Sequence, residues 1–296
     1  MRAWVSWPMC AMCLFAGLDI FLLWWQLFGE ASSPKLRPTA QCAPAGGGQS
    51  RADVVVGTHS SLALATAYDK AFEPFARVSV PNKRAYAAYH GLSLFILGPG
   101  ALACDRPASW SKILAARTAL DAGHEWVLWT DSDVVFTNMN ATVIDAAHPR
   151  TRAAMADDHV HLILAEDAPG RINNGCFLLR SSAWSRHFLT RVWNASAFLR
   201  EAPNRAASRF GDQAAFAHVI AQERAAHSGE RDASPVAIVP QNEFNAYPST
   251  YSTGLLLVHL AGCTASLKRT KARCARELEE WAALLAPPGD SSGAHA

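Results

Sequence analysis

Between residues 52 and 286, short apolar runs alternate with stretches whose apolar residues recur at helical spacing. The runs predict strands over 52–58, 92–97, 126–130, 161–164, 176–179, 236–239 and 255–260. The periodic stretches predict helices over 81–90, 109–123, 182–198, 212–222 and 267–285. Strands that alternate with helices are typical of a mainly parallel sheet covered on both faces, so the pattern predicts an α/β fold.

Capping and turn residues set the expected limits of these elements. Pro81 is expected to open the first helix, and Ser109 is expected to cap the second. The segment 168–175 is rich in glycine and asparagine and predicts a loop. The run over 52–58 predicts a buried first strand.

The strand over 126–130 has the most informative ending. It is continuous, apolar and rich in aromatic residues, and it stops at Asp131 and Asp133, which are separated by Ser132. In open α/β sheets, ligands bind at the carboxyl ends of strands, and hard divalent cations prefer carboxylate oxygen. The pattern therefore indicates a metal site for a phosphate-bearing substrate. Because Asp and Ser are also common turn residues, an acidic turn without function is the alternative.

The first thirty residues differ from the rest of the chain. Asp19 is the one charged residue between Ala3 and Phe28, and the apolar length is sufficient to cross a bilayer. A carboxylate near mid-membrane costs about 2.5–3.5 kcal/mol, which the flanking apolar residues could offset. We therefore expect a signal-anchor over residues 1–30, with a cleaved signal peptide as the alternative.

The composition and low-complexity segments define the rest of the domain organisation. Residues 31–51 are rich in Ala, Pro, Gly, Ser and Gln and predict a flexible stem, and residues 287–296 predict a disordered tail. Half of the chain is hydrophobic and 18% is charged, so the region 52–286 can bury a sizeable core. A formal charge of +2 argues neither for nor against nucleic-acid binding, but the sequence has no basic, aromatic recognition motif, so we expect none.

Cysteines and glycosylation tripeptides bear on the cellular compartment. Five of the seven cysteines lie beyond the apolar segment, and a Cys263–Cys274 disulfide is one pairing that an oxidising lumen would allow. The odd number leaves a thiol that could link a homodimer. The tripeptides that begin at Asn140 and Asn194 are acceptor sequences for N-glycosylation, which points weakly to the secretory pathway.

A series of short motifs then occurs in one order along the chain. They are Asn82-Lys-Arg-Ala-Tyr86, His90-Gly91, Trp110-Ser-Lys112, Asp131-Ser-Asp133, Asn173-Asn-Gly-Cys-Phe-Leu-Leu-Arg180, Trp184-Ser185, Gly211-Asp-Gln213 and Val258-His-Leu-Ala-Gly-Cys263. Together they resemble glycosyltransferase family 34, the galactosyl, mannosyl and xylosyl transferases. The resemblance implies a GT-A type nucleotide-diphospho-sugar transferase fold behind an N-terminal membrane anchor, and a Golgi type II membrane protein with a lumenal catalytic domain.

The resemblance also implies the chemistry. It makes the chain a retaining enzyme that moves a hexosyl or pentosyl unit from a UDP- or GDP-sugar to a glycan acceptor. It assigns Asp131, Asp133 and His259 to the metal. Imidazole nitrogen suits Mn²⁺ better than Mg²⁺, so Mn²⁺ is the expected cofactor and Mg²⁺ the alternative. A lone histidine at a strand end is otherwise more often structural.

The same resemblance assigns roles around the sugar. Gln213 is expected near the anomeric carbon as dipolar support for same-face attack, and Asp212 is expected to hold sugar hydroxyls, although Asp212 is also a good helix N-cap. The expected donor- and acceptor-contacting residues are Lys112, Ser132, Asn173, Asn174, Gly175, Gly262 and Lys268. Some relatives carry a lysine where this chain has Thr264, so Lys268 is the substitute contact to the pyrophosphate. An exposed helix lysine at 112 and a plain turn at 173–175 are the alternatives.

Two other functions fit parts of the pattern. The Asp131-x-Asp133 ending also resembles the opening motif of haloacid-dehalogenase-like phosphatases, where the first aspartate is the nucleophile. That family needs a late acidic pair after an apolar strand, and none follows residues 236–239. An inactive, glycan-binding relative of the transferases is the non-enzymatic alternative. The retained Asp131, Asp133, Gln213 and His259 argue against it.

Overall fold

The computed structural model describes residues 52–145, 147–167, 170–199, 211–226, 234–263 and 269–285. The predicted anchor, stem and tail lie outside these residues. Within the described part of the chain, no helix has the length and apolar character that a membrane span requires.

A seven-stranded sheet forms the centre of the described part, in the order β1-β3-β2-β4-β7-β6-β8. Its strands are β1 (Asp53–Val55), β2 (His59–Ala67), β3 (Leu92–Leu97), β4 (Trp126–Thr130), β6 (Leu162–Glu166), β7 (Ile172–Arg180) and β8 (Val236–Val239). The neighbours of β2 are parallel to it, as is β8 to β6, whereas β1 and β7 are antiparallel to their neighbours. Five of the seven strands therefore run in one direction, and the expected mainly parallel α/β sheet is confirmed.

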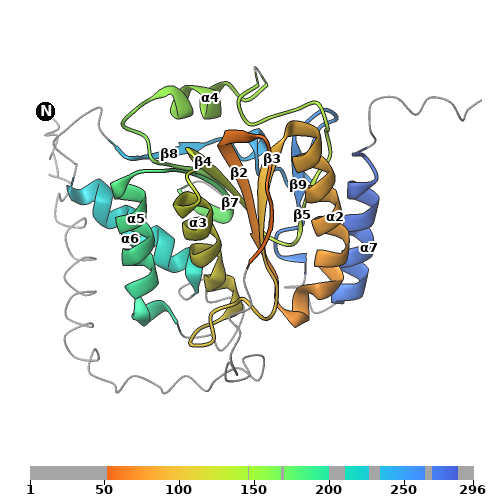
Figure 1. Cartoon of the computed structure of the whole chain (residues 1–296), viewed down its shortest axis with the longest axis horizontal. Helices are drawn as coiled ribbons and strands as arrows, with labels where there is room; N and C mark the ends of the chain where they lie inside the picture. Colours follow the sequence, from red (N-terminus) through yellow and green to blue (C-terminus); the bar gives the residue numbers. More distant parts are fainter. Residues whose placement is uncertain are drawn as a thin grey trace, which may run out of the picture. The chain divides into compact units, whose positions relative to one another are not determined.

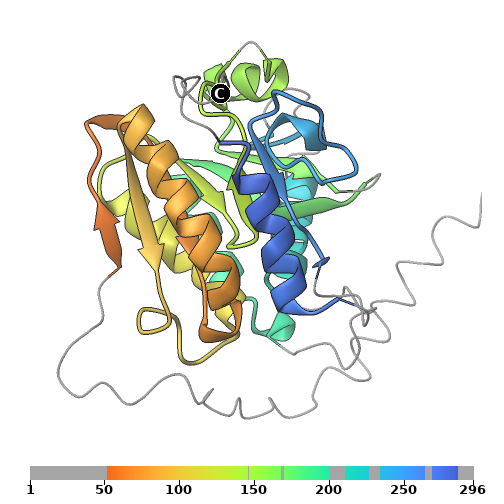
Figure 2. The ribbon, with the colours of Figure 1, turned by 90° about the vertical axis from the view of Figure 1, so that its right-hand side faces the viewer.

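Helices cover both faces of the sheet (Figure 1). One face packs against α3 (Ser111–Asp121), α5 (Ala183–Asn194) and α6 (Asp212–Ala226). The other face packs against α2 (Glu73–His90), and α2 in turn packs against α7 (Lys271–Ala282), which lies beside it in Figure 2. A short helix, α4 (Pro149–Ala156), precedes β6.

The central strand β4 is a continuous apolar run because both of its faces are buried. Val127 and Trp129 belong to the core beneath α3, whereas Trp126 and Leu128 belong to the core beneath α2. Successive side chains of a strand point to opposite faces, so a strand covered on both sides must be apolar at every position.

A second, two-stranded sheet joins β5 (Val134–Phe136) to β9 (Leu257–His259) in antiparallel pairing. The segment after β9 is tied to α7 by the Cys263–Cys274 disulfide, which confirms that expected pairing. Cys104 is also disulfide-bonded, and Cys176 is a buried free thiol.

Several predicted limits were wrong. The strand at 53–55 is an edge strand whose first two residues are exposed, and not a buried strand. The long parallel strand is β2, whose run of small and polar residues gave a weak pattern. Helix α2 begins at Glu73, two turns before Pro81, because Pro74 occupies its first turn and Pro81 is accepted inside the helix. Ser109 does not cap α3 but lies in a preceding 3₁₀ turn.

The segment 172–175 is also not a loop. Asn173, Asn174 and Gly175 lie on β7, which begins at Ile172. Glycine and asparagine favour turns locally, but the pairing of β7 with β4 and β6 on its two sides overrides that preference.

Candidate functional site

The two carboxylates of the Asp131-Ser-Asp133 segment lie in the turn that connects β4 to β5. The Asp131 amide donates to the Gly175 carbonyl at 2.7 Å, which extends the β4–β7 pairing by one residue, and the Val134 amide donates back to the Asp131 carbonyl at 3.2 Å. The Asp131 side chain is 32% exposed and that of Asp133 is 17% exposed, so both reach a partly open edge of the sheet. Ser132, between them, is buried.

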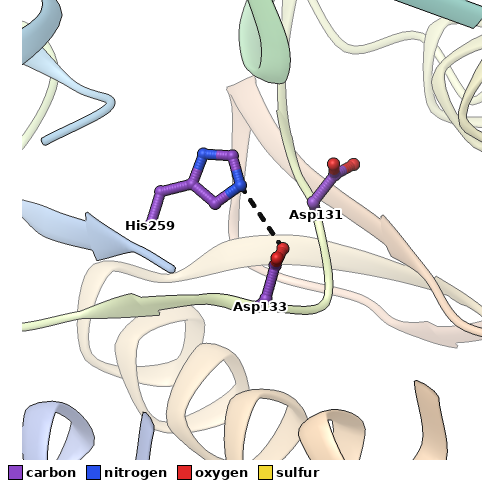
Figure 3. A group of neighbouring side chains, drawn as sticks. All are labelled: Asp131, Asp133 and His259. Carbon is purple, nitrogen blue, oxygen red and sulfur yellow. Dashed lines mark ion pairs between the residues drawn. The ribbon is translucent and has the colours of Figure 1, made fainter. Parts of the chain in front are cut away.

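His259 reaches the same edge from a distant part of the chain. It ends β9, where it pairs with Val134, and the next amide, Leu260, donates to the Asp133 carbonyl at 3.0 Å. Its Nε2 lies 3.4 Å from Asp133 Oδ1. Figure 3 shows this pair with the Asp131 carboxylate beside it, and one ligand atom from each of the three residues lies within 4.8 Å of the others. Strand pairing therefore brings the three predicted metal ligands together.

The chemistry of this group fits a divalent cation. Two carboxylates and one imidazole offer hard oxygen and borderline nitrogen donors, a set that suits Mn²⁺. Burial opposes ionisation of Asp133, but the adjacent His259 imidazole holds the pKa of Asp133 below its usual range. Burial raises the pKa of Asp131, and the ammonium of Lys112 opposes that rise. A bound cation would stabilise both carboxylates in their charged form.

Lys112 lies on the other side of Asp131 and is itself buried. Its Nζ, on the first turn of α3, is 3.2 Å from Asp131 Oδ1 and 2.8 Å from Asp212 Oδ2. The same ammonium donates to the carbonyl and side-chain oxygens of Asn174 at 3.2 and 3.3 Å. Burial lowers the pKa of Lys112, but the two carboxylates outweigh it and raise that pKa above its usual value. The side chain is therefore a fixed positive charge, not an exposed helix lysine.

Asp212 and Gln213 begin α6 and face the same network. Asp212 Oδ2 accepts from Asn174 Nδ2 at 2.8 Å, and Gln213 Oε1 accepts from the Asn174 amide at 3.3 Å. Burial raises the pKa of Asp212, but Lys112 and hydrogen bonds that include one from Ser109 lower it below the usual range. Asp212 is therefore an ionised carboxylate at neutral pH.

Asn173 and Gly175 form the back of the site on β7. Asn173 Nδ2 donates to the Tyr247 hydroxyl at 2.7 Å, and Asn173 Oδ1 accepts from the Gly175 amide at 2.7 Å. Gly175 packs directly against His259, because a Cβ at this position would lie 2.2 Å from His259 Cε1. Glycine is needed here for the close approach of the imidazole to the strand backbone.

Three further residues at the site were not predicted from the sequence: Lys83, Asn245 and Tyr247. Lys83 Nζ donates to the Asp131 carbonyl at 2.7 Å and to Thr66 Oγ1 at 3.2 Å, and its side chain is fully buried. Burial lowers the pKa of Lys83 to about 8. The sequence held a weak signal for Lys83, because this lysine lies among the buried positions of α2. That signal can be read only when the buried face of the helix is already known.

Asn245 and Tyr247 come from the segment before β9. Asn245 Oδ1 lies 2.8 Å from His259 Nδ1, and the Tyr247 ring packs edge-on against His259 at 5.8 Å between centroids. Tyr247 also donates to Asp167 Oδ1 at 2.6 Å. Neither residue belongs to a motif with its own spacing, so the sequence carried no signal for them.

The polar residues of the motif from Asn82 to His90 bind the backbone of the segment that follows the two aspartates. Asn82 exchanges two hydrogen bonds with the backbone of Phe136, at 2.8 and 2.9 Å. Tyr86 donates to the Ala141 carbonyl at 2.7 Å, and His90 Nε2 lies 2.8 Å from the Met139 carbonyl. This face of α2 therefore fixes the segment that follows the two aspartates.

The remaining predicted residues lie apart from this network. Gly262 is exposed, with a φ of 68° that favours glycine, three residues beyond His259. Lys268 and the Thr264 departure lie outside the described residues, so the expected pyrophosphate contact stays a prediction.

Comparison with known proteins identifies the family. The family model described as the galactosyl transferase GMA12/MNN10 family matches residues 51–270, which is most of the chain. An uncharacterized alpha-1,2-galactosyltransferase of Schizosaccharomyces pombe is 27% identical over 252 residues, 72% of this chain and 61% of that protein. An alpha-1,2-galactosyltransferase of the same yeast is 25% identical over 227 residues, 64% of this chain and 56% of that protein. The match thus spans somewhat more than half the length of these relatives.

The fold has a solved counterpart. The crystal structure of a glycosyltransferase involved in the glycosylation of the major capsid of PBCV-1 superposes with a TM-score of 0.51 at 16% identity. The superposition covers 74% of this chain and 99% of that one. It supports a glycosyltransferase-like fold, and the family match favours the transferase interpretation over the phosphatase one.

Proposed function

This chain belongs to the galactosyl transferase GMA12/MNN10 family, which is glycosyltransferase family 34, and we propose that it is a metal-dependent, retaining glycosyltransferase. It would move a hexosyl or pentosyl unit from a nucleotide-diphosphate sugar to a glycan acceptor. The observation that carries the proposal is the convergence of Asp131, Asp133 and His259 at one edge of the sheet. The family alone implies a transferase, and these ligands add the dependence on a metal.

Asp131, Asp133 and His259 would hold Mn²⁺, or Mg²⁺ in its place. The bound cation would supply electrostatic stabilisation of the diphosphate leaving group without proton transfer. The protein's own contribution is preorganisation. Lys112 keeps Asp131 and Asp212 at fixed positions 3.2 and 2.8 Å from one ammonium, so little rearrangement is needed when charge develops.

Residues around Asn174 would position the sugar. Asp212 is ionised, and its carboxylate could accept hydrogen bonds from sugar hydroxyls. Gln213 is a neutral amide beside the same strand, and its dipole would support an oxocarbenium-like centre during same-face attack. Because Asp212 is held by Lys112 and Asn174, we assign it to binding and not to covalent attack on the anomeric carbon.

The donor and the cellular location follow by analogy with the family. Both yeast relatives are named alpha-1,2-galactosyltransferases, so UDP-galactose is the first donor to test among UDP- and GDP-sugars. We place the protein in the Golgi membrane, anchored by residues 1–30 with the catalytic domain in the lumen. The Cys263–Cys274 disulfide and the exposed sequon residues Asn140 and Asn194 support an oxidising, glycosylating compartment.

The test is a nucleotide-sugar panel with the full chain. Sugar transfer and release of UDP or GDP are measured with Mn²⁺, and again after chelation with EDTA. We expect activity to require the metal, and D133N to lower Mn²⁺-dependent transfer by about 10²-fold or more, since metal stabilisation is worth several kcal/mol. Asp158→Asn makes the same chemical change at a surface position and should leave activity unchanged. Normal transfer by D133N would contradict the proposal.

A further inference from the structure

The imidazole of His259 is held in one orientation from two sides. On one side its Cε1 edge lies against the backbone of Gly175, where no Cβ could be placed. On the other side Nδ1 lies 2.8 Å from Asn245 Oδ1. These contacts leave Nε2 facing the Asp133 carboxylate at 3.4 Å. Nδ1 therefore faces the protein interior, and Nε2 faces the candidate metal site.

Asn245 is well suited to hold that ring. Its side chain is completely buried, and its backbone amide donates to the Gln241 carbonyl at 2.9 Å. The next residue, Ala246, accepts from the His259 amide at 2.8 Å, so this segment is fixed against β9. Among the described residues, Asn245 Nδ2 has no hydrogen-bond partner. Its contact with His259 is thus the one hydrogen bond that the buried amide makes there.

The tautomer of His259 decides whether it can bind a metal. A neutral imidazole carries one N–H, and the nitrogen that carries it cannot donate a lone pair to a cation. If Asn245 Oδ1 accepts from Nδ1–H, the lone pair of Nε2 faces the two aspartates. If the amide were reversed, Nδ2 would donate to Nδ1, and Nε2–H would face Asp133 instead. The orientation of the buried Asn245 side-chain amide therefore decides whether Nε2 of His259 has a lone pair available for a metal.

We propose that Asn245 is a positioning residue that fixes His259 in its Nδ1–H tautomer and so presents Nε2 to the cation. The inference rests on the proposed function, because it needs a metal at Asp131, Asp133 and His259. It assigns a role to a residue that touches neither metal nor substrate. Such outer partners of a ligating histidine typically change metal affinity by about 10–100-fold.

The test measures binding of Mn²⁺ alone to the full chain, from the loss of the free-ion signal in electron paramagnetic resonance. Asn245→Leu keeps the branched shape of the side chain and removes the acceptor, and we expect Mn²⁺ affinity to fall by about 10–100-fold. Asn245→Asp keeps an acceptor that cannot become a donor while ionised, and we expect its affinity to stay within about threefold of the wild type. The ¹⁵N shifts of the His259 ring at neutral pH should show Nδ1–H in the wild type and in N245D.

Thermal unfolding of the metal-free proteins separates positioning from a purely structural role. If Asn245 only packs the core, N245L would lower the unfolding midpoint while its Mn²⁺ affinity stays at the wild-type value, and the inference would be overturned. If N245L does not fold, weaker Mn²⁺ binding by the folded N245D, or an Nε2–H shift in the wild type, would overturn it equally. A wild-type chain that binds no Mn²⁺ would instead contradict the proposed function itself.

Discussion

Two buried lysines reach Asp131 from opposite faces of the sheet, and they contact different parts of this residue. Lys83 comes from α2 and donates to the backbone carbonyl of Asp131. Lys112 comes from α3 and pairs with the Asp131 carboxylate and with Asp212. Both side chains are buried, so the two lysines differ in their interaction partners and not in their degree of burial.

The partners decide how firmly each ammonium keeps its proton. Burial lowers the pKa of Lys83 to about 8, because a carbonyl and a hydroxyl compensate poorly for the loss of water. Burial acts on Lys112 in the same direction, but two carboxylates at hydrogen-bond distance raise its pKa instead. Lys112 therefore supplies a firmly held charge to the carboxylates of the site, whereas Lys83, which loses its proton more easily, holds the backbone of Asp131 in position. Lys112→Met and Lys83→Met test this division, and Gly175→Ala tests the geometry of the site without a change of charge.

The largest effect is expected for Lys112→Met. The substitution leaves the buried Asp212 and the partly exposed Asp131 without their counter-charge, so we expect the free energy of unfolding to fall by about 3–5 kcal/mol. Transfer should fall by about 10²–10³-fold, as for loss of a preorganised electrostatic group. Denaturant unfolding and steady-state kinetics measure the two effects. Lys70→Met, at an exposed lysine, is the control, and equal behaviour of the two variants would refute the division.

A smaller effect is expected from a change of geometry without a change of charge. Gly175→Ala places a methyl group 2.2 Å from His259 Cε1, so the imidazole or β7 must shift. We expect a loss of about 1–3 kcal/mol in stability from overpacking, and an Mn²⁺ affinity about 10–100-fold weaker from the displaced ligand.

Gly98→Ala is the matched control for this variant, because the nearest atom to its Cβ would be the Tyr68 hydroxyl oxygen at an ordinary 3.6 Å. Calorimetric titration with Mn²⁺ compares the two. If G175A bound Mn²⁺ as tightly as G98A, the packing of His259 against β7 would have no bearing on the metal.

The smallest effect on transfer is expected for Lys83→Met, less than about tenfold, or 1.4 kcal/mol, because Asn82 and Tyr86 still anchor the following segment. The distinguishing effect of this variant is on the pH dependence of stability. The folded pKa of Lys83 is about 8 against an unfolded value of 10.5, so between these values the unfolded chain binds more protons. The stability of the wild type relative to K83M should therefore rise by about 3 kcal/mol from pH 8 to pH 10.5.

The same measurement on K112M should show no such rise in this pH range. Because the folded pKa of Lys112 is raised, its contribution to stability is complete below the unfolded value of 10.5 and is lost only as pH rises further. The wild type relative to K112M should show no rise between pH 8 and pH 10.5. A rise in both series would mean that the two lysines share one environment.

The sequence and the structure contributed different parts of this site. The strand that ends in Asp131 and Asp133 was predictable, because a strand buried on both faces must be apolar throughout and its polar end is then conspicuous. Lys112, Asp212 and Asn174 were predictable as members of ordered motifs, but their mutual contacts were not. Their hydrogen bonds cross from α3 to α6 to β7, at sequence separations that local patterns do not encode.

The sequence by itself determined the family, the α/β class and the residues able to bind a cation, since these depend on residue type and on order along the chain. The tertiary structure decided which polar residues surround them. Lys83 is one lysine on a long helix, and Asn245 one asparagine before a short strand, until packing removes both from water. Only burial makes a polar group depend on the few partners within its reach, and burial is a property of the assembled fold.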